Sequence, residues 1–424
     1  MSSGGRCASL SLLAAVFAAA GAGRARAQPA APPAPLRVSV LTFGPGDHPF
    51  FKFGHDAIWI HDPAEGSDRV YNFGTFSFDS PRLIFDFLHG RMTYWLSVAG
   101  LPRTLASYEA ENRSIQVQEL RLDPPVAQAL KERLDVNAQP QNRAYKYDYF
   151  ADNCSTRVRD AIDWATGGRL RAVGHVPARL TLRDQALRMT ASYLPLYLAI
   201  DLVLGPSTDR SIDRWGEMFI PEELARSLAD VRVPDPLADP GSTEALPLVA
   251  SDQVLFHARR PDPPRVAPRW RGWFLAVGLA VGGLFWLLGW CVTAPDLRRR
   301  GRIAARLALG LLISLWGALL GFVGTFLVYV WVATDHVVAH RNQNLFLCPP
   351  WALVLVVAGF GIAFGARWAA SLARVLALAA LAAATAAVLL KLGFGQHQDN
   401  GRWIAFFVPA WLGLTAAVSR LPRR

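Results

Sequence analysis

The chain of 424 residues has only four cysteines and few charged residues. The cysteines are scattered along the chain and lack metal-ligand spacing, which excludes a disulfide framework and a cysteine metal site: Cys7, Cys154, Cys291 and Cys348. Charged residues make up 18% of the chain and hydrophobic residues 52%, which indicates a membrane protein. The net charge of +11 does not indicate nucleic-acid binding, because much of the arginine excess lies beside apolar runs, where it sets membrane topology.

The first 35 residues have the pattern of a secretory signal followed by a linker. Arg6 precedes a short apolar run, and Ala25-Arg-Ala27 is typical of a cleavage site. We expect a signal peptide over 1–27, a Pro/Ala linker over 28–35, and a mature domain outside the cytoplasm. An uncleaved anchor is the alternative, although the apolar run is short for a membrane span.

The next segment, 36–230, has the pattern of an α+β domain. Short alternating runs predict strands over 37–43, 53–60, 69–73 and 114–122, while helical spacing predicts helices over 104–113 and 125–136. We therefore expect a small antiparallel sheet surrounded by helices. The apolar run 192–204 is too short to span a membrane, and predicts either a core helix or an interfacial lid. The Pro- and Asp-rich stretch 231–269 is expected to be a linker.

The remaining segment, 270–424, predicts an all-α membrane domain. Five apolar runs have the length and composition of spans, near 273–294, 307–333, 351–366, 372–390 and 403–419. With the N-terminal domain outside, all three arginine clusters fall on the cytoplasmic side, as does the C-terminus. The sequence therefore predicts a multi-pass membrane protein with its α+β domain outside the cytoplasm.

The stretch from Tyr145 to Asp160 is the strongest candidate for a catalytic site. Its first half alternates as a strand, and its second half has helical spacing that begins after Asp152 and Asn153, both good N-cap residues. Cys154 therefore lies in the first helical turn, where unpaired N–H groups and the helix dipole favour a thiolate and can stabilise an oxyanion. The alternative is a small buried thiol without a catalytic role.

A thiol nucleophile needs a base and a group that orients the base. His55 is the best-placed histidine, at the start of a predicted strand and behind a glycine. Asn72 on the partner strand is the preferred orienting group. Asp56 is the weaker choice, because side chains alternate along a strand and its carboxyl group points to the opposite face from His55.

Further polar residues are candidates for substrate binding, and no metal or cofactor is expected. Asp152 and Asn153 are first of all helix caps, and Tyr147 lies just before them. The polar loop 334–344 connects two predicted spans and favours a substrate-binding loop at the membrane surface, with plain solvation as the alternative. The candidates in this loop are His336, His340, Asn342 and Asn344.

The order of these elements, a strand histidine, a polar residue on the next strand and a helix-start cysteine far downstream, resembles the permuted papain-like superfamily that includes the lecithin–retinol acyltransferases. The chain is most similar to the N-terminal periplasmic domain of the Lnb-type bacterial lipoprotein N-acyltransferases. The blocks that carry this resemblance are Phe53-Gly-His55, Val70-Tyr-Asn-Phe-Gly74, Asn112 with Ser114-Ile115, Tyr147 to Asp160, and the Thr334-Asp-His336 loop.

The resemblance implies acyl transfer to lipoproteins, with His55 and Cys154 matching the catalytic pair of the family. The expected partners are a phospholipid acyl donor in the membrane and lipoprotein N-termini. A periplasmic thiol peptidase or amidase acting on cell-wall peptide would need the same two residues, and a non-catalytic membrane scaffold would need neither. The polar loops between the spans argue against a peptidase with a simple anchor.

Overall fold

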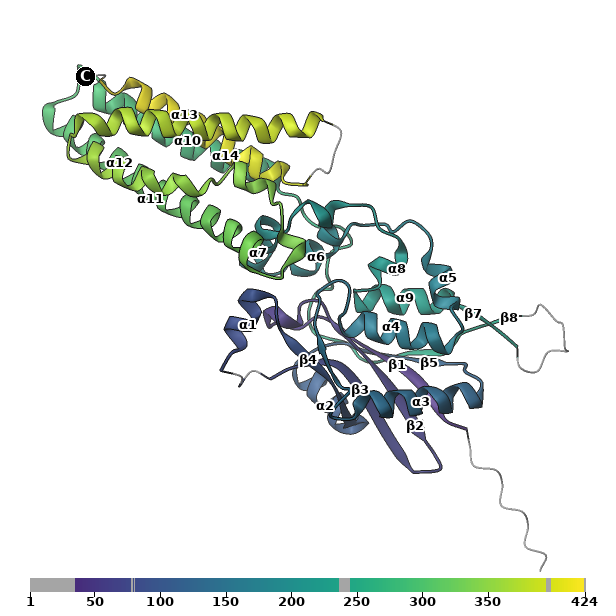
Figure 1. Cartoon of the computed structure of the whole chain (residues 1–424). Coiled ribbons are helices and arrows are strands. Elements are labelled where there is room, and N and C mark those ends of the chain that lie inside the picture. The colour runs from purple at the N-terminus through teal and green to yellow at the C-terminus, as the bar shows by residue number, and fades with distance from the viewer. Residues whose placement is uncertain (1–34, 78, 80, 236–244, 394–397, 423–424) are drawn as a thin grey trace, which may run out of the picture.

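The computed structural model describes residues 35–77, 79, 81–235, 245–393 and 398–422. The predicted signal segment 1–27 and residues 28–34 of the predicted linker lie outside the described residues. The described chain forms an α+β domain at its N-terminal end and a bundle of long helices at its C-terminal end (Figure 1). This arrangement confirms the predicted fold class.

The α+β domain is built on one antiparallel sheet of seven strands, in the order β6-β4-β3-β2-β1-β5-β9. Alternating side chains in each strand supply apolar surface to helices on both sides of the sheet. The strands are β1 (Arg37–Phe43), β2 (His55–Asp62), β3 (Ser67–Thr75), β4 (Thr93–Gly100), β5 (Ile115–Leu120), β6 (Ala144–Lys146) and β9 (Val249–Phe256).

Helices of the N-terminal domain cover the two faces of this sheet. On one face, Ile58 and Tyr71 pack with Val158 of α4 and Leu224 of α9. On the other face, Phe43 and its neighbours pack against α2. The helices are α1 (Leu83–His89), α2 (Leu101–Ala110), α3 (Pro124–Ala138), α4 (Cys154–Ala165), α5 (Arg169–Gly174), α6 (Leu182–Thr190), α7 (Leu194–Val203), α8 (Arg214–Glu217) and α9 (Pro221–Asp230).

Three segments differ from the expectations. The predicted linker 231–269 contains a small hairpin, β7 (Arg232–Pro234) and β8 (Ala245–Pro247), and the edge strand β9, which pairs with β5. Strand β4 lies in an aromatic-rich stretch to which no element was assigned. The strand expected from Tyr145 ends at Lys146, because β6 pairs only with the first three residues of β4.

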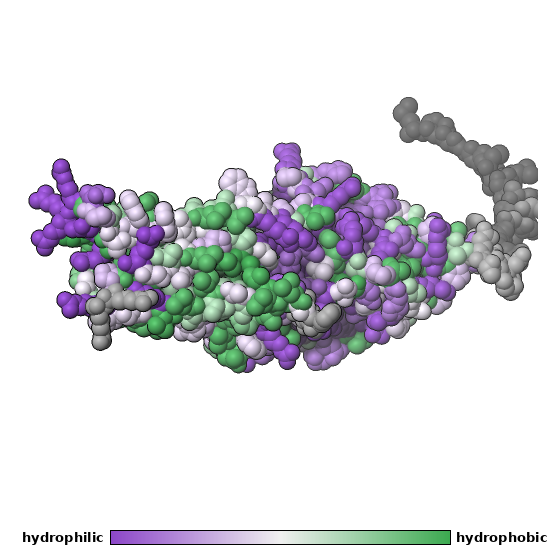
Figure 2. Space-filling view, turned by 90° about the horizontal axis from the view of Figure 1, so that it is seen from above, coloured by the Kyte–Doolittle hydropathy of each residue, from purple (hydrophilic) through white to green (hydrophobic). Residues whose placement is uncertain are grey.

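The C-terminal domain consists of α10 (Arg271–Thr293), α11 (Arg299–Ala333), α12 (Val354–Ala363), α13 (Arg367–Leu389) and α14 (Gly401–Arg420). Four of these helices are long and apolar enough to cross a membrane. A fifth span results if the pair Val337–Phe346 and Pro350–Ala363, bent by 55°, crosses as one unit. Figure 2 shows hydrophobic surface over the bundle between a hydrophilic tip and the hydrophilic N-terminal domain.

Small residues allow the long helices to approach closely. Side chains added at Gly282 of α10 or Gly413 of α14 would overlap the backbone of the opposite helix. Such contacts between small residues are a usual way for helices to associate in lipid, where apolar burial supplies little driving force. The packing is therefore that expected of a membrane bundle.

Candidate active site

Cys154 is the first residue of α4, and its backbone position is fixed by the preceding cap. The side chain of Asn153 accepts a hydrogen bond from Thr156 N at 2.9 Å, and the Thr156 hydroxyl accepts one from Asn153 N at 2.8 Å. The Asn153 amide also donates to the carbonyls of Tyr149 and Phe219, at 3.0 Å and 2.9 Å. This reciprocal capping box confirms the predicted helix start.

The sulfur of Cys154 lies where β2 and β3 separate. The two strands pair from Ile58 and Tyr71 to Asp62 and Ser67, so the beginning of β2 runs beyond this pairing. The backbone N–H groups of Asp56 and Ser155 form hydrogen bonds to the sulfur. A Cβ atom at Gly74, where φ is +83°, would lie 3.3 Å from Cys154 Cβ, so the chain reaches this close approach only with glycine.

Burial raises the pKa of the Cys154 thiol to about 12. The neighbouring Asp56 carboxyl group adds to this increase, while the two N–H groups and the Arg113 guanidinium oppose it. The sequence predicted that the helix start favours a thiolate. That prediction was wrong for the resting state, because the cost of desolvating the charged sulfur exceeds the stabilisation from the helix start.

His55 lies at the same end of the sheet, as the first residue of β2. Its ring lies beside the stacked rings of Phe43 and Tyr108, 6.0 Å from each centroid, while those two rings are 3.6 Å apart. Desolvation and the nearby Arg113 guanidinium lower the pKa of His55 to about 3, and a hydrogen bond with the Asn72 side chain opposes this shift. The imidazole is therefore neutral at pH 7, and it is a weak base in the resting site.

His55 and Cys154 have neighbours in common, although in the part of the chain that the structure describes no hydrogen bond joins the two side chains directly. The charge of Arg113 acts on both groups, and the residue after His55 donates its N–H to the sulfur. Asn72 bonds to His55 and also donates to the Val70 carbonyl at 3.2 Å, which holds its amide in place. The structure thus brings the three predicted residues to one end of the sheet.

Asp56 points to the other face of the sheet from His55, as alternation along the strand predicted. Its carboxyl group is fully buried and accepts a hydrogen bond from Thr42 Oγ1 at 2.9 Å. Burial raises the pKa of Asp56 to about 7, against the effect of the Ser155 and Thr42 hydroxyl groups. The sequence favoured Asn72 over Asp56 as the group that orients His55. The structure places the buried Asp56 carboxyl group under α4, next to the Cys154 thiol, whose pKa it raises.

Two predicted substrate-binding residues beside Cys154 have structural partners. Asp152 forms a two-pronged ion pair with Arg157, with one contact at 2.7 Å, so the cap of α4 is Asn153 alone. Tyr147 stacks on Tyr94 with ring centroids 4.0 Å apart, and its ring lies near Gly74. Of these residues, Tyr147 is the one whose ring adjoins the cysteine.

The predicted loop histidines donate hydrogen bonds to backbone carbonyls of the chain itself. His336 Nε2 bonds to the Phe87 carbonyl at 2.9 Å, and His340 Nε2 bonds to the Thr334 carbonyl at 3.2 Å. Within the described ranges, no group of three or more His, Cys, Asp or Glu side chains is arranged to hold a metal ion. The ring of His336 also stacks on Tyr149, at 6.0 Å between centroids, which connects this loop to the segment before Cys154.

Asn342 and Asn344 join the two domains. The Asn342 amide donates to the carbonyls of Leu202 and Val203, both at 2.8 Å, and the Asn344 amide donates to the Leu202 carbonyl at 2.9 Å. These carbonyls end α7, where a helix leaves acceptors without partners. Both asparagines are buried, so the structure gives them a role in fixing α7; substrate binding by them stays a prediction.

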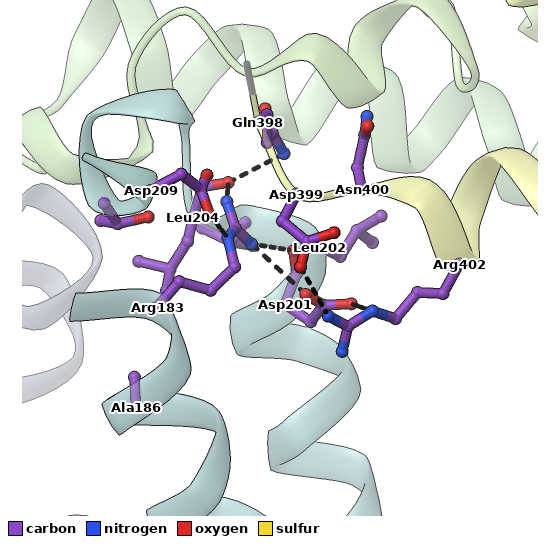
Figure 3. A network of polar contacts seen from close by, with 12 residues as sticks. Arg183, Ala186, Asp201, Leu202, Leu204, Asp209, Gln398, Asp399, Asn400 and Arg402 are labelled. Atoms are coloured by element: carbon purple, nitrogen blue, oxygen red, sulfur yellow. Dashed lines mark hydrogen bonds and ion pairs between the residues drawn. The ribbon is translucent and has the colours of Figure 1, made fainter. Parts of the chain in front are cut away.

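A buried charge network lies at the same junction (Figure 3). Asp201 of α7 is fully buried between Arg183 of α6 and Arg402 of α14, with N–O distances of 3.3 Å and 3.4 Å. Arg183 also bonds to Asp209 at 2.7 Å. Asp201 lies within the apolar run 192–204, and an acid in such a run, with arginines near other apolar segments, is the sequence signal for this network.

The family model described as the Lnb N-terminal periplasmic domain matches residues 25–185. The matched segment, less than half of the chain, is similar to this family. Comparisons with curated proteins and with solved structures gave no match.

The Lnb N-terminal periplasmic domain of this chain contains His55, Asn72 and Cys154, together with the sheet from β1 to β6. The match ends within α6, so α7 to α9, β9 and the helical domain lie beyond it. The protein is therefore a membrane protein with an Lnb-type domain in the periplasm, followed by helices that can span the membrane four or five times.

Proposed function

We propose that this protein is a cysteine-dependent acyltransferase of the inner membrane, which moves an acyl chain from a phospholipid to the N-terminal amine of lipoproteins. The observation that carries the proposal is the environment of Cys154. Its sulfur lies at a helix start, receives the N–H groups of Asp56 and Ser155, and shares an end of the sheet with a neutral histidine. The Lnb-type domain supports the choice of substrate.

In the first half-reaction, His55 takes the proton of the Cys154 thiol while the sulfur attacks the ester carbonyl of a phospholipid. The resulting oxyanion is stabilised by the positive end of α4. The C–O bond then breaks, the leaving lysophospholipid oxygen takes the proton from the His55 imidazolium, and a thioester remains on Cys154. Asn72 orients the imidazole through its hydrogen bond.

In the second half-reaction, the free α-amine of a diacylglyceryl-cysteine attacks the thioester carbonyl. His55 takes a proton from the amine and returns it to the sulfur as the C–S bond breaks, which yields an amide and the resting thiol. Because the resting thiol and imidazole are both neutral, the proton moves during attack instead of being transferred beforehand.

The test uses the full-length protein in vesicles of bacterial phospholipid, with mass spectrometry of its cysteine peptides. We expect an acyl thioester on the Cys154 peptide that hydroxylamine removes, and transfer of this chain to a synthetic diacylglyceryl-cysteine peptide. Cys154→Ala and His55→Ala should abolish both products. Cys348→Ala is the matched control, because this second buried cysteine lies in the helical domain.

A Cys154→Ala protein that still acylates the peptide would contradict the proposal. Cleavage of cell-wall peptide by the wild-type protein, without any acyl thioester, would instead identify a thiol peptidase. Unchanged behaviour of the Cys154 and His55 variants in every assay would identify a non-catalytic scaffold.

A further inference from the structure

Seven aromatic rings near the candidate active site form a closed circle, in which each ring contacts the next and the last contacts the first. Neighbouring ring centroids lie between 4.0 Å and 6.4 Å apart, the range of direct aromatic contact. The aromatic circuit consists, in this order, of Phe50, Phe76, Tyr94, Tyr147, Tyr149, His336 and Phe87. Its members come from five separate parts of the chain, including the loop between two membrane helices.

One side of the circuit adjoins the cysteine. A Cβ atom at Gly74 would lie 3.7 Å from the Tyr147 ring and 3.3 Å from Cys154 Cβ. Only the backbone of this glycine therefore lies between the ring and the cysteine. Tyr147 is held there by its own N–H, which donates to the Met92 carbonyl at 3.1 Å. The apolar surface of the circuit therefore begins next to the candidate nucleophile.

The opposite side of the circuit is attached to the end of a membrane helix. Phe87 belongs to α1, which Figure 1 shows on the side of the N-terminal domain nearest the helical domain. His89 of α1 bonds through Nε2 to the Tyr329 hydroxyl of α11 at 3.0 Å, and its carbonyl accepts from Asp335 N at 2.8 Å. These bonds fix this side of the circuit at the level where α11 ends.

Exposed apolar side chains surround this side of the circuit. Ile84 and Phe85 of α1 are 74% and 49% exposed, and Val332 and Val337 beside the end of α11 are 72% and 65% exposed. Large apolar side chains with this exposure, continuous with a membrane-spanning helix, are expected where a protein contacts the bilayer surface. The circuit therefore extends from the lipid level to the thiol.

We propose that the aromatic circuit is the binding site of the acyl chain of the lipid donor, which lies along these rings with its ester carbonyl at Cys154. This inference rests on the proposed acyl transfer, and it adds the surface that recognises the chain. The exposed rings of Phe50 and Tyr149 offer rigid apolar contact to methylene groups, each worth part of the free energy of leaving water.

A charged cavity at the domain junction is the competing lipid site. It has a volume of about 510 Å³ and is lined by residues of both signs, among them Arg269, Arg271, Lys391 and Asp399. Its arginines already pair with Asp399, at 3.8 Å and 3.5 Å. Such a cavity suits a head group, whereas an acyl chain requires the apolar circuit.

The first experiment locates the chain by photolabelling. The full-length Cys154→Ser protein is placed in phospholipid vesicles that contain phosphatidylethanolamine with a diazirine in the middle of one acyl chain. After illumination, we expect labelled peptides to include 81–91 or 144–153 of the circuit. Labels confined to α10, α13 or the residues of the charged cavity would overturn the inference.

The second experiment measures chain-length dependence of Cys154 acylation. For Phe87→Ala and Tyr149→Ala, we expect the rate with a long-chain phospholipid to fall about tenfold, and the rate with a water-soluble acetyl thioester to change less than about twofold. Trp164→Ala is the matched control, since this exposed ring lies at the far end of α4, and both rates should stay at the wild-type level. Phe87→Leu should restore most of the long-chain rate.

The two rates separate this inference from the proposed function. If the wild-type protein is acylated by the long-chain donor but the circuit variants keep both rates, or lose both equally, the circuit is not the chain site. If no donor acylates Cys154, the proposed function fails, and the photolabels alone decide whether the circuit binds lipid chains.

Discussion

Replacement of Asp56 by asparagine should remove a pH dependence from the stability of the N-terminal domain. The carboxyl group is fully buried beneath α4, and its pKa is raised from 3.8 to about 7. A folded-state pKa above the unfolded value stabilises the fold below pH 3.8, and this contribution is lost as pH rises through about 7. Asparagine stays neutral over the whole range and keeps an acceptor for Thr42.

The size of the effect follows from the difference of about three pKa units, which corresponds to about 4 kcal/mol. About 2 to 3 kcal/mol of this falls between pH 5 and pH 8. Between pH 5 and pH 8, the melting temperature of the wild-type protein should therefore fall by about 5 to 10 °C more than that of the Asp56→Asn variant, for a domain of this size.

The assay is thermal unfolding of the full-length protein in detergent at several pH values from 5 to 8. Asp160→Asn is the control, because this exposed carboxylate lies on the same helix and should leave the wild-type slope unchanged. Parallel curves for the wild type and Asp56→Asn would refute the assignment of a buried proton to Asp56. In the same variant, alkylation of Cys154 should become faster, because a carboxyl group that raises the thiol pKa is absent.

Four further predictions concern the junction, the bundle and the thiol. Asn342→Ala should expose the end of α7 to protease and cost about 1 to 3 kcal/mol, since buried carbonyls lose their donors; an unchanged cleavage pattern would contradict this. Asp201→Ala should destabilise the junction by about 3 kcal/mol in thermal unfolding, because Arg183 and Arg402 lose the carboxylate between them, although each keeps one other acidic partner. Gly413→Leu should lower the melting temperature by forcing α10 and α14 apart, while Gly283→Ala, which faces open space, should not. Alkylation of wild-type Cys154 should accelerate from pH 7 to pH 10 without a plateau, as its pKa of about 12 requires.

Local patterns predicted the elements whose own residues decide their structure. Arg37–Phe43 alternates and forms β1, and Asn153 followed by helical spacing begins α4 at Cys154. The edge strand β9 was missed because Pro and Asp residues on both sides of it suggested a linker, while its structure depends on a distant partner, β5. Because β5 and β9 lie far apart in the sequence, the residues around β9 contain little sign of their pairing.

The candidate site was predictable in composition but not in electrostatics. His55, Asn72 and Cys154 could be chosen from their places on predicted elements, and the fold brings them to one end of the sheet. The resting protonation state depends on burial by other segments and on Asp56, which the alternation rule had placed away from His55. The joining roles of Asn342 and Asn344 also depend on α7, about 140 residues earlier in the chain.

The neutral state of Cys154 has a consequence for its survival in the periplasm, where thiols are readily oxidised to disulfides. Thiol–disulfide exchange requires a thiolate, and a thiol with a pKa of about 12 is ionised in only about one molecule in 10⁵ at pH 7. The Cys154 thiol is thus protected from oxidation by the same burial that opposes its ionisation. In the proposed mechanism, the thiol reacts only when the neutral imidazole takes its proton while the sulfur attacks a substrate carbonyl.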